Sequence, residues 1–143
     1  MFWPHQQREH QTTIWIALKD ATVANGCMAF VPGSRKLGEL PPVSFTNPAD
    51  IFESVPAEVR GVKPRVCELP AGSVTFHNGL TLHFAGPNKT EAVREAFAII
   101  YMPDGTTYNG QRHIVTDPLG LSIGERLEGE MFPIVSTCGN DAP

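Results

Sequence analysis

The residues best suited to chemistry are a histidine and an arginine in the second half of the chain. His83 ends the segment 80–83, which follows an Asn-Gly turn, and Arg94 opens an apolar segment eleven residues later. If the two segments form neighbouring strands, both side chains can point into one cavity. The imidazole can then hold a metal ion, while the guanidinium forks onto a carboxylate bound to that metal. The spacing therefore predicts a combined site for a metal and a carboxylate.

Short β-strands must position these two side chains. The chain contains 13 glycines and 13 prolines, and turn pairs such as Asn25-Gly26 separate its apolar runs. Short strands at close spacing indicate an all-β antiparallel sandwich or jelly roll rather than alternating strands and helices. We expect strands over Thr12–Leu18, Cys27–Val31, Arg65–Leu69, Ser73–His77, Leu80–Phe84 and Ala96–Met102.

The longest connection between these strands, residues 36–65, is interpreted as a variable insert. Prolines recur along it, and Asn47-Pro48 can start a short helix over Ala49–Ser54. The last residues, 136–143, are expected to fray. With 143 residues the chain is long enough for a single domain around one core.

Composition and charge argue against several functions. The 15 acidic residues outnumber the 11 basic ones, and no Lys/Arg cluster can follow a phosphate backbone, so nucleic-acid binding is not expected. No apolar run reaches the roughly 18–20 residues of a membrane span, and the first residues lack the pattern of a signal peptide. Cys27, Cys67 and Cys138 are odd in number and form no C-x-x-C pair, which favours a reducing cytoplasm.

Four stretches, in order, resemble the phytanoyl-CoA dioxygenase family of Fe(II)/2-oxoglutarate-dependent oxygenases. They are residues 13–22, residues 25–34 with their Pro-Gly-Ser element, residues 69–101, and the closing segment 124–133. The resemblance implies a double-stranded β-helix, the cupin-like jelly roll, that binds Fe(II) and 2-oxoglutarate. It also implies that His83 is the last of three iron ligands and that Arg94 grips the far carboxylate of 2-oxoglutarate. In such a site Trp15 lies near the co-substrate.

The family's first two iron ligands form a His-x-Asp motif, for which two alignments remain open. In one, the His-Gln-Gln at 5–7 is the motif with glutamine in place of aspartate. In the other, which we favour, the Phe-Trp-Pro at 2–4 matches the aromatic segment that follows the motif. Either alignment lacks the carboxylate that such iron sites use. We therefore expect the C-terminal portion of the jelly roll, incomplete at its N-terminus, with an incomplete metal site.

Each of these three site residues also has an ordinary structural interpretation. His83 can be a strand histidine bonded to a backbone carbonyl. Arg94 can be a solvated arginine beside Glu91 and Glu95. The surrounding motif favours the site interpretation for both residues. Trp15 is equally compatible with core packing and with a place beside the co-substrate.

Other polar residues are interpreted more simply. His77 and Asn78 can support His83, although a hairpin pair that faces solvent or a neighbouring strand is the better interpretation. Asn88 is expected to shape the turn at 86–88, and His113 to lie on the surface.

Residues near the start of the chain bear on whether the metal site can be completed. His5, Glu9 and His10 could supply substitute ligands, although a solvated role is the simpler one. Two departures from the family pattern weaken the case for activity. Arg35 follows Pro-Gly-Ser where the family often has histidine, and Ala85 replaces a small hydroxyl residue that can bond the co-substrate.

Three functions remain open. The first is an Fe(II)/2-oxoglutarate dioxygenase that hydroxylates a small organic substrate. The second is a catalytically inactive jelly-roll module that binds a small carboxylate. The third is a structural module whose unpaired sheet edges assemble with a second copy. A homodimer is expected through such edges, or through exchange of the N-terminal segment.

Overall fold

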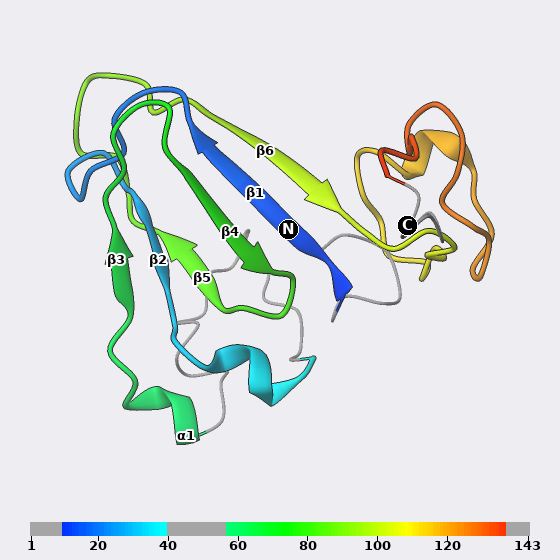
Figure 1. Cartoon of the computed structure of the whole chain (residues 1–143), viewed down its shortest axis with the longest axis horizontal. Coiled ribbons are helices and arrows are strands. Elements are labelled where there is room, and N and C mark those ends of the chain that lie inside the picture. Colours follow the sequence, from blue (N-terminus) through cyan, green and yellow to red (C-terminus); the bar gives the residue numbers. More distant parts are fainter. Residues whose placement is uncertain (1–9, 40–56, 137–143) are drawn as a thin grey trace, which may run out of the picture. The chain divides into compact units, whose positions relative to one another are not determined.

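The computed structural model describes residues 10–39 and 57–136 (Figure 1). The chain divides into two compact units. In the described ranges the first unit comprises residues 10–39 and 57–102, and the second comprises residues 103–136. All the strands lie in the first unit.

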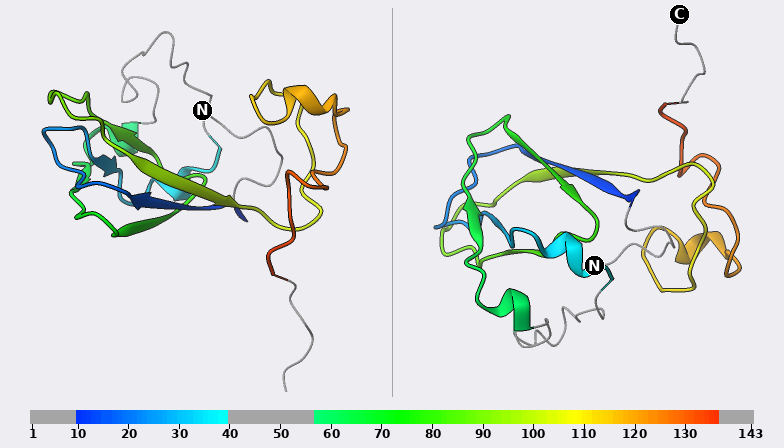
Figure 2. Two further views of the ribbon diagram at one scale, coloured as in Figure 1. Left: turned by 90° about the horizontal axis from the view of Figure 1, so that it is seen from above. Right: turned by 60° about the horizontal axis from the view of Figure 1, so that its bottom comes forward.

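The first unit contains two three-stranded antiparallel sheets. In the larger sheet β1 (Thr12–Ala17) lies between β4 (Val74–Asn78) and β6 (Ala96–Tyr101). In the smaller sheet β2 (Met28–Phe30) lies between β3 (Arg65–Cys67) and β5 (His83–Ala85). Figures 1 and 2 show both sheets as green and blue arrows.

The core of this unit follows from the two-residue repeat of the central strand. Thr13, Trp15 and Ala17 are buried, whereas the alternate residues Ile14 and Ile16 are half-buried, because successive strand side chains point to opposite faces. The buried face of β1 packs against the segment that leads into β2, and together they form one apolar cluster. Its members are Trp15, Ala17, Ala21, Cys27 and Met28, with Phe30 and Leu69 packed against them.

Two antiparallel sheets with few helices confirm the predicted all-β jelly-roll class. The described helices are one turn each: η2 (Ser34–Leu37), α1 (Ala57–Arg60) and η3 (Asp117–Leu119). The helix expected at 49–54 lies outside the described residues. None of the described helices is long and apolar enough to span a membrane.

All six expected strands are present. Five are shorter than predicted, the fourth is shifted by one residue, and the fifth also starts later. Leu80–Phe84 was expected, whereas β5 begins at His83. The cause is a turn organised by Asn78, whose side-chain Oδ1 accepts the Leu80 N–H and whose carbonyl accepts the Thr81 N–H. These local bonds satisfy backbone donors that a strand would otherwise use.

The second unit is built from turns tied together by backbone hydrogen bonds. The Tyr108 N–H donates to the Glu125 carbonyl, and the Leu127 N–H donates to the Thr106 carbonyl. An Arg126–Asp104 ion pair at 2.9 Å lies on the surface of the same pair of segments. The family-like segment 124–133 is thus anchored to residues 104–108.

Candidate active site

Arg94 is held immediately before β6 by a carbonyl and an aromatic ring. Its Nη1 donates to the Gly26 carbonyl oxygen, and its Cζ lies 5.8 Å from the centroid of the Trp15 ring. A cation at this distance over an indole face is attracted by the ring quadrupole. The guanidinium has five N–H donors in a planar fork, so a single bond to Gly26 leaves capacity for a carboxylate.

Gly26 makes this arrangement possible because only glycine fits its position. Its φ of +83° is in the left-handed region, and a Cβ there would lie 2.2 Å from the Gly86 carbonyl oxygen. The loop before β2 therefore lies directly against the loop after β5. The Gly26 carbonyl is presented to Arg94 across this close approach.

Trp15 is a core residue that also contacts Arg94, and its place beside a co-substrate stays a prediction. Its side chain is 8% exposed and belongs to the apolar cluster between the sheets, while its ring also faces Arg94. Core packing thus fixes the ring that positions the guanidinium.

His83 presents one ring nitrogen to its surroundings. Its Nδ1 lies 2.8 Å from the Thr81 carbonyl oxygen. A carbonyl only accepts hydrogen bonds, so Nδ1 is the donor in this contact, and a neutral ring with this tautomer would have its lone pair on Nε2. Metal-ligating histidines commonly have this arrangement, in which the other ring N–H is fixed by a carbonyl or carboxylate.

His77 is buried on the inner face of β4, so it faces its neighbours rather than solvent, the two alternatives left open for it. It is 8% exposed and lies opposite Thr13 in the register with β1, because strand alternation turns residues 75 and 77 inward. Its ring centroid is 4.6 Å from that of His83. Burial, together with the nearby His83, lowers the pKa of His77 to about 4.

The expectation that His83 and Arg94 lie on neighbouring strands is wrong. His83 begins β5 in the smaller sheet, whereas Arg94 precedes β6 in the larger one. Consecutive strands switch sheets here, so the two residues belong to different sheets, and His83 is exposed whereas Arg94 is half-buried. Trp15 contacts Arg94, and the ring of His77 contacts that of His83.

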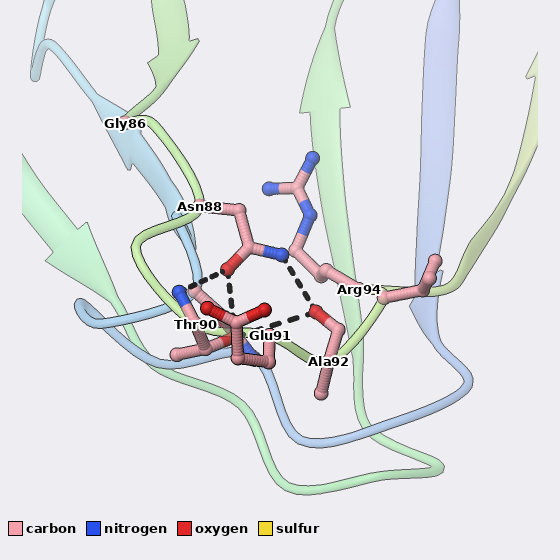
Figure 3. Close-up of a pocket in the computed structure, with 8 residues that line it drawn as sticks. Gly86, Asn88, Thr90, Glu91, Ala92 and Arg94 are labelled. Atoms are coloured by element: carbon pink, nitrogen blue, oxygen red, sulfur yellow. Dashed lines mark hydrogen bonds between the residues drawn. The ribbon is translucent and has the colours of Figure 1, made fainter.

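An open surface cavity of about 370 Å³ lies beside Arg94 (Figure 3). Its wall is mainly the loop 86–94 together with Asn25, and the bonds of the Asn88 side chain lie after the turn at 86–88 that it was expected to shape. The Asn88 Oδ1 accepts the Thr90 N–H, and the Asn88 Nδ2 donates to the Ala92 carbonyl. This loop connects β5, which carries His83, to the strand that follows Arg94.

The donor set for iron is not complete within the described residues. No group of three or more His, Cys, Asp or Glu side chains there could hold a metal ion. His83 and His77 are two imidazoles without a carboxylate beside them, whereas the iron sites of such oxygenases use two histidines and one carboxylate. The described side chains thus fit a bound carboxylate at Arg94 but not the full iron site. His5 and Glu9 lie outside the described range.

His113 is buried, which corrects the prediction of a surface position. It is 5% exposed, its backbone N–H donates to the Asp117 Oδ1, and its Nδ1 accepts the Val115 N–H. Burial lowers its pKa, although the nearby Asp117 opposes the shift. These bonds close the turn before η3, so His113 has a structural role. Arg35 and Ala85 are both exposed.

Two antiparallel sheets, with a tryptophan–arginine contact and a separate pair of histidine rings, fit a jelly-roll protein of the cupin-like class. The model of the phytanoyl-CoA dioxygenase (PhyH) family matches residues 1–96, and the chain belongs to this family. A phytanoyl-CoA dioxygenase domain-containing protein 1 homolog from Caenorhabditis elegans is 30% identical over 101 residues, which cover 66% of this chain and 35% of that protein. The dioxygenase ALT11 from Alternaria alternata is 30% identical over 84% of this chain and 35% of its own length.

The chain is also similar in structure to solved non-heme alpha ketoglutarate dependent enzymes. The non-heme alpha ketoglutarate dependent carbocyclase SnoK from nogalamycin biosynthesis has a TM-score of 0.76 and 34% identity, covering 94% of this chain and 53% of that chain. The epimerase SnoN in complex with Fe3+, alpha ketoglutarate and nogalamycin RO has a TM-score of 0.66 and 30% identity over 92% of this chain and 52% of its own. The chain thus spans about a third of those curated relatives and about half of these solved ones.

Proposed function

We propose that this chain provides the co-substrate site of an Fe(II)/2-oxoglutarate-dependent dioxygenase that hydroxylates a small organic molecule. The observation that carries the proposal is Arg94, held between the Gly26 carbonyl and the Trp15 ring. A half-buried guanidinium fixed in this way suits bidentate binding of a carboxylate. Relatives that are named as dioxygenases, and the SnoN complex with alpha ketoglutarate, support the same chemistry.

In this proposal each residue has a limited role. Arg94 binds the far carboxylate of 2-oxoglutarate, Trp15 packs beside it, and His83 offers Nε2 to a metal. Iron, when bound, would supply oxygen activation. Because the described donors do not complete the iron site, no chemical step is assigned to it.

The test is 2-oxoglutarate binding, measured by calorimetry on the metal-free chain. Arg94→Ala should lose about 2–4 kcal/mol of binding free energy, the magnitude expected for a partly buried charge-assisted pair. Arg94→Lys should recover only part, since an ammonium lacks the planar fork. Arg112→Ala is the matched control, because the Arg112 side chain is 93% exposed. Unchanged affinity in Arg94→Ala would refute the proposed co-substrate site.

A catalytically inactive module that binds a small carboxylate is the alternative. It is favoured by the lack of a three-ligand metal group within the described residues. Formation of succinate from 2-oxoglutarate when Fe(II) and oxygen are added separates the two functions. Turnover by the wild-type chain supports the dioxygenase, and binding without turnover supports the module.

We further propose that the chain forms one functional domain in which residues 36–65 are a variable insert, and that it assembles as a homodimer. β4 and β6 are the edge strands of the larger sheet. An edge strand can pair with the edge strand of a second copy. A cytoplasmic location is proposed because Cys27 and Cys67 are free thiols, as is common in a reducing compartment.

A further inference from the structure

The cavity beside Arg94 has two opposite charges in its wall. It measures about 370 Å³, a volume within the roughly 300–1,000 Å³ of small-molecule sites. Glu91 and Arg94 are the charged members of its lining. In the view of Figure 3 the guanidinium and the carboxylate lie on opposite sides of the Asn88 amide. A ligand in the cavity therefore meets one cation and one anion, and the wall as a whole carries no net charge.

The neutral polar side chains of the wall are engaged in holding the loops together. Both ends of the Asn88 amide are bonded within the loop 86–94. The Asn25 amide is used in a similar way, because its Oδ1 accepts a backbone N–H and its Nδ2 donates to a backbone carbonyl, both within residues 20–22. The Thr90 hydroxyl donates to Asn88 Oδ1 at 2.7 Å. Recognition of a ligand therefore depends mainly on the two charged groups.

Neither charged group forms an ion pair in the part of the chain that the structure describes. Arg94 donates to an uncharged carbonyl, and its planar fork retains further N–H donors. Glu95, the acid that follows it in the sequence, pairs instead with Lys19 at 2.7 Å. The exposed Glu91 carboxylate pairs neither with Arg94 nor with another base. Two opposite charges thus share one cavity without neutralising each other.

We propose that this cavity binds a small zwitterion, with the carboxylate of the ligand on Arg94 and its ammonium group on Glu91. Each end of such a ligand meets the opposite charge and can form a charge-assisted hydrogen bond. A dicarboxylate satisfies only Arg94, because its second carboxylate is repelled by Glu91. Small amino acids are therefore the ligand class that the cavity fits.

This zwitterion site rests on the carboxylate-binding role of Arg94 in the proposed function. What it adds is Glu91, as the residue that recognises an amine. Both ligands need the same guanidinium, so the zwitterion competes with 2-oxoglutarate and is not the molecule that is hydroxylated.

The test measures dissociation constants on the metal-free chain by ligand-observed NMR. The ligands are glycine, β-alanine and γ-aminobutyrate, whose two charges lie progressively further apart, and acetate, propionate and butyrate, which match them but lack the amine. At least one amino acid should bind more tightly than its matched carboxylate. Glu91→Gln should lower the affinity for that amino acid about two- to fivefold, the scale of an exposed ion pair, and should not weaken the matched carboxylate. Arg94→Ala should weaken both, whereas Glu130→Gln, at an exposed position, should change neither.

Two outcomes would overturn the proposal: no amino acid that the wild-type chain binds more tightly than its matched carboxylate, or an amino-acid affinity that Glu91→Gln does not lower. Binding of 2-oxoglutarate is measured in parallel on the same samples. If 2-oxoglutarate binds through Arg94 while the amino acids do not bind, only the zwitterion site fails. If an amino acid binds through Arg94 and Glu91 while 2-oxoglutarate does not bind, only the proposed function fails.

Discussion

At the scale of single residues, Thr75 has a hydroxyl that the described part of the chain leaves without a partner. A buried hydroxyl that makes no hydrogen bond contributes a desolvation penalty rather than stability. Ser34 is the contrasting case in the same unit, because its Oγ donates to the Val31 carbonyl at 2.8 Å and accepts the Leu82 N–H at 2.9 Å. Removing the two hydroxyls should therefore have opposite effects on the free energy of unfolding.

Thr75→Val should leave the unfolding free energy unchanged or raise it by up to about 1 kcal/mol, because valine keeps the shape and removes the unpaired hydroxyl. Ser34→Ala, the control, should lower it by about 1–3 kcal/mol, because the part-buried Leu82 N–H loses its acceptor. Urea denaturation of the ligand-free chain measures both. A loss of more than 1 kcal/mol in Thr75→Val would show that its hydroxyl does have a partner.

The site residues could be predicted from sequence only where a motif marks them. His83 and Arg94 stand in a recognisable segment, and the structure places Arg94 beside Trp15 and His83 beside His77. His77 could not be assigned in the same way. Strand alternation says that residues 75 and 77 share a face, but the inner face becomes known only once the second sheet is in place.

At the scale of elements, the loop before β2 and the loop after β5 are locked by Gly26. This glycine combines a left-handed φ of +83° with a backbone contact that leaves no space for a Cβ. Gly72 has nearly the same φ, +84°, but nothing within 4 Å of its would-be Cβ. Substitution at Gly72 therefore tests backbone strain alone, whereas substitution at Gly26 tests strain together with steric overlap.

Gly72→Ala should cost about 1 kcal/mol of unfolding free energy, from left-handed strain alone. Gly26→Ala should cost at least about 2 kcal/mol more, because the Gly86 carbonyl must also move. Chemical denaturation compares the two variants. Equal costs would mean that the two loops can separate freely, and that Arg94 does not depend on their contact.

Strand order illustrates what sequence patterns cannot supply at this scale. The expected strands were largely correct because apolar alternation and Gly-Pro turns mark them locally. The pairing of β1 with both β4 and β6 depends on contacts between segments far apart in the chain, which no local pattern encodes. The late start of β5 depends on the side-chain bonds of Asn78, which override the apolar run before it.

At the scale of the whole molecule, the outer face of the larger sheet carries an apolar surface. Phe76 is 66% exposed and Phe97 is 56% exposed, and both lie opposite residues of β1 that point outward. Val74 and Tyr101 extend the same face. Contiguous apolar surface of this kind commonly marks a contact with another protein surface.

The proposed homodimer places this surface and the neighbouring sheet edges at or near the contact. Light scattering over a wide concentration range should therefore give twice the chain mass at high concentration. Phe76→Glu should shift the equilibrium towards the monomer. Val93→Glu, at a loop position that is 69% exposed, should not shift it. A monomer at every concentration would rule out the dimer.

The contact between Arg94 and Gly26 joins residues 68 positions apart in the chain. Closing so long a loop is entropically unfavourable, and contacts of high sequence separation are slow to form. The proposed carboxylate site is therefore expected to assemble late in folding, after the local turns. A ligand held there would act mainly after the folding barrier, slowing unfolding while leaving the folding rate nearly unchanged. Co-substrate would thus prolong the lifetime of the native chain rather than help it to fold.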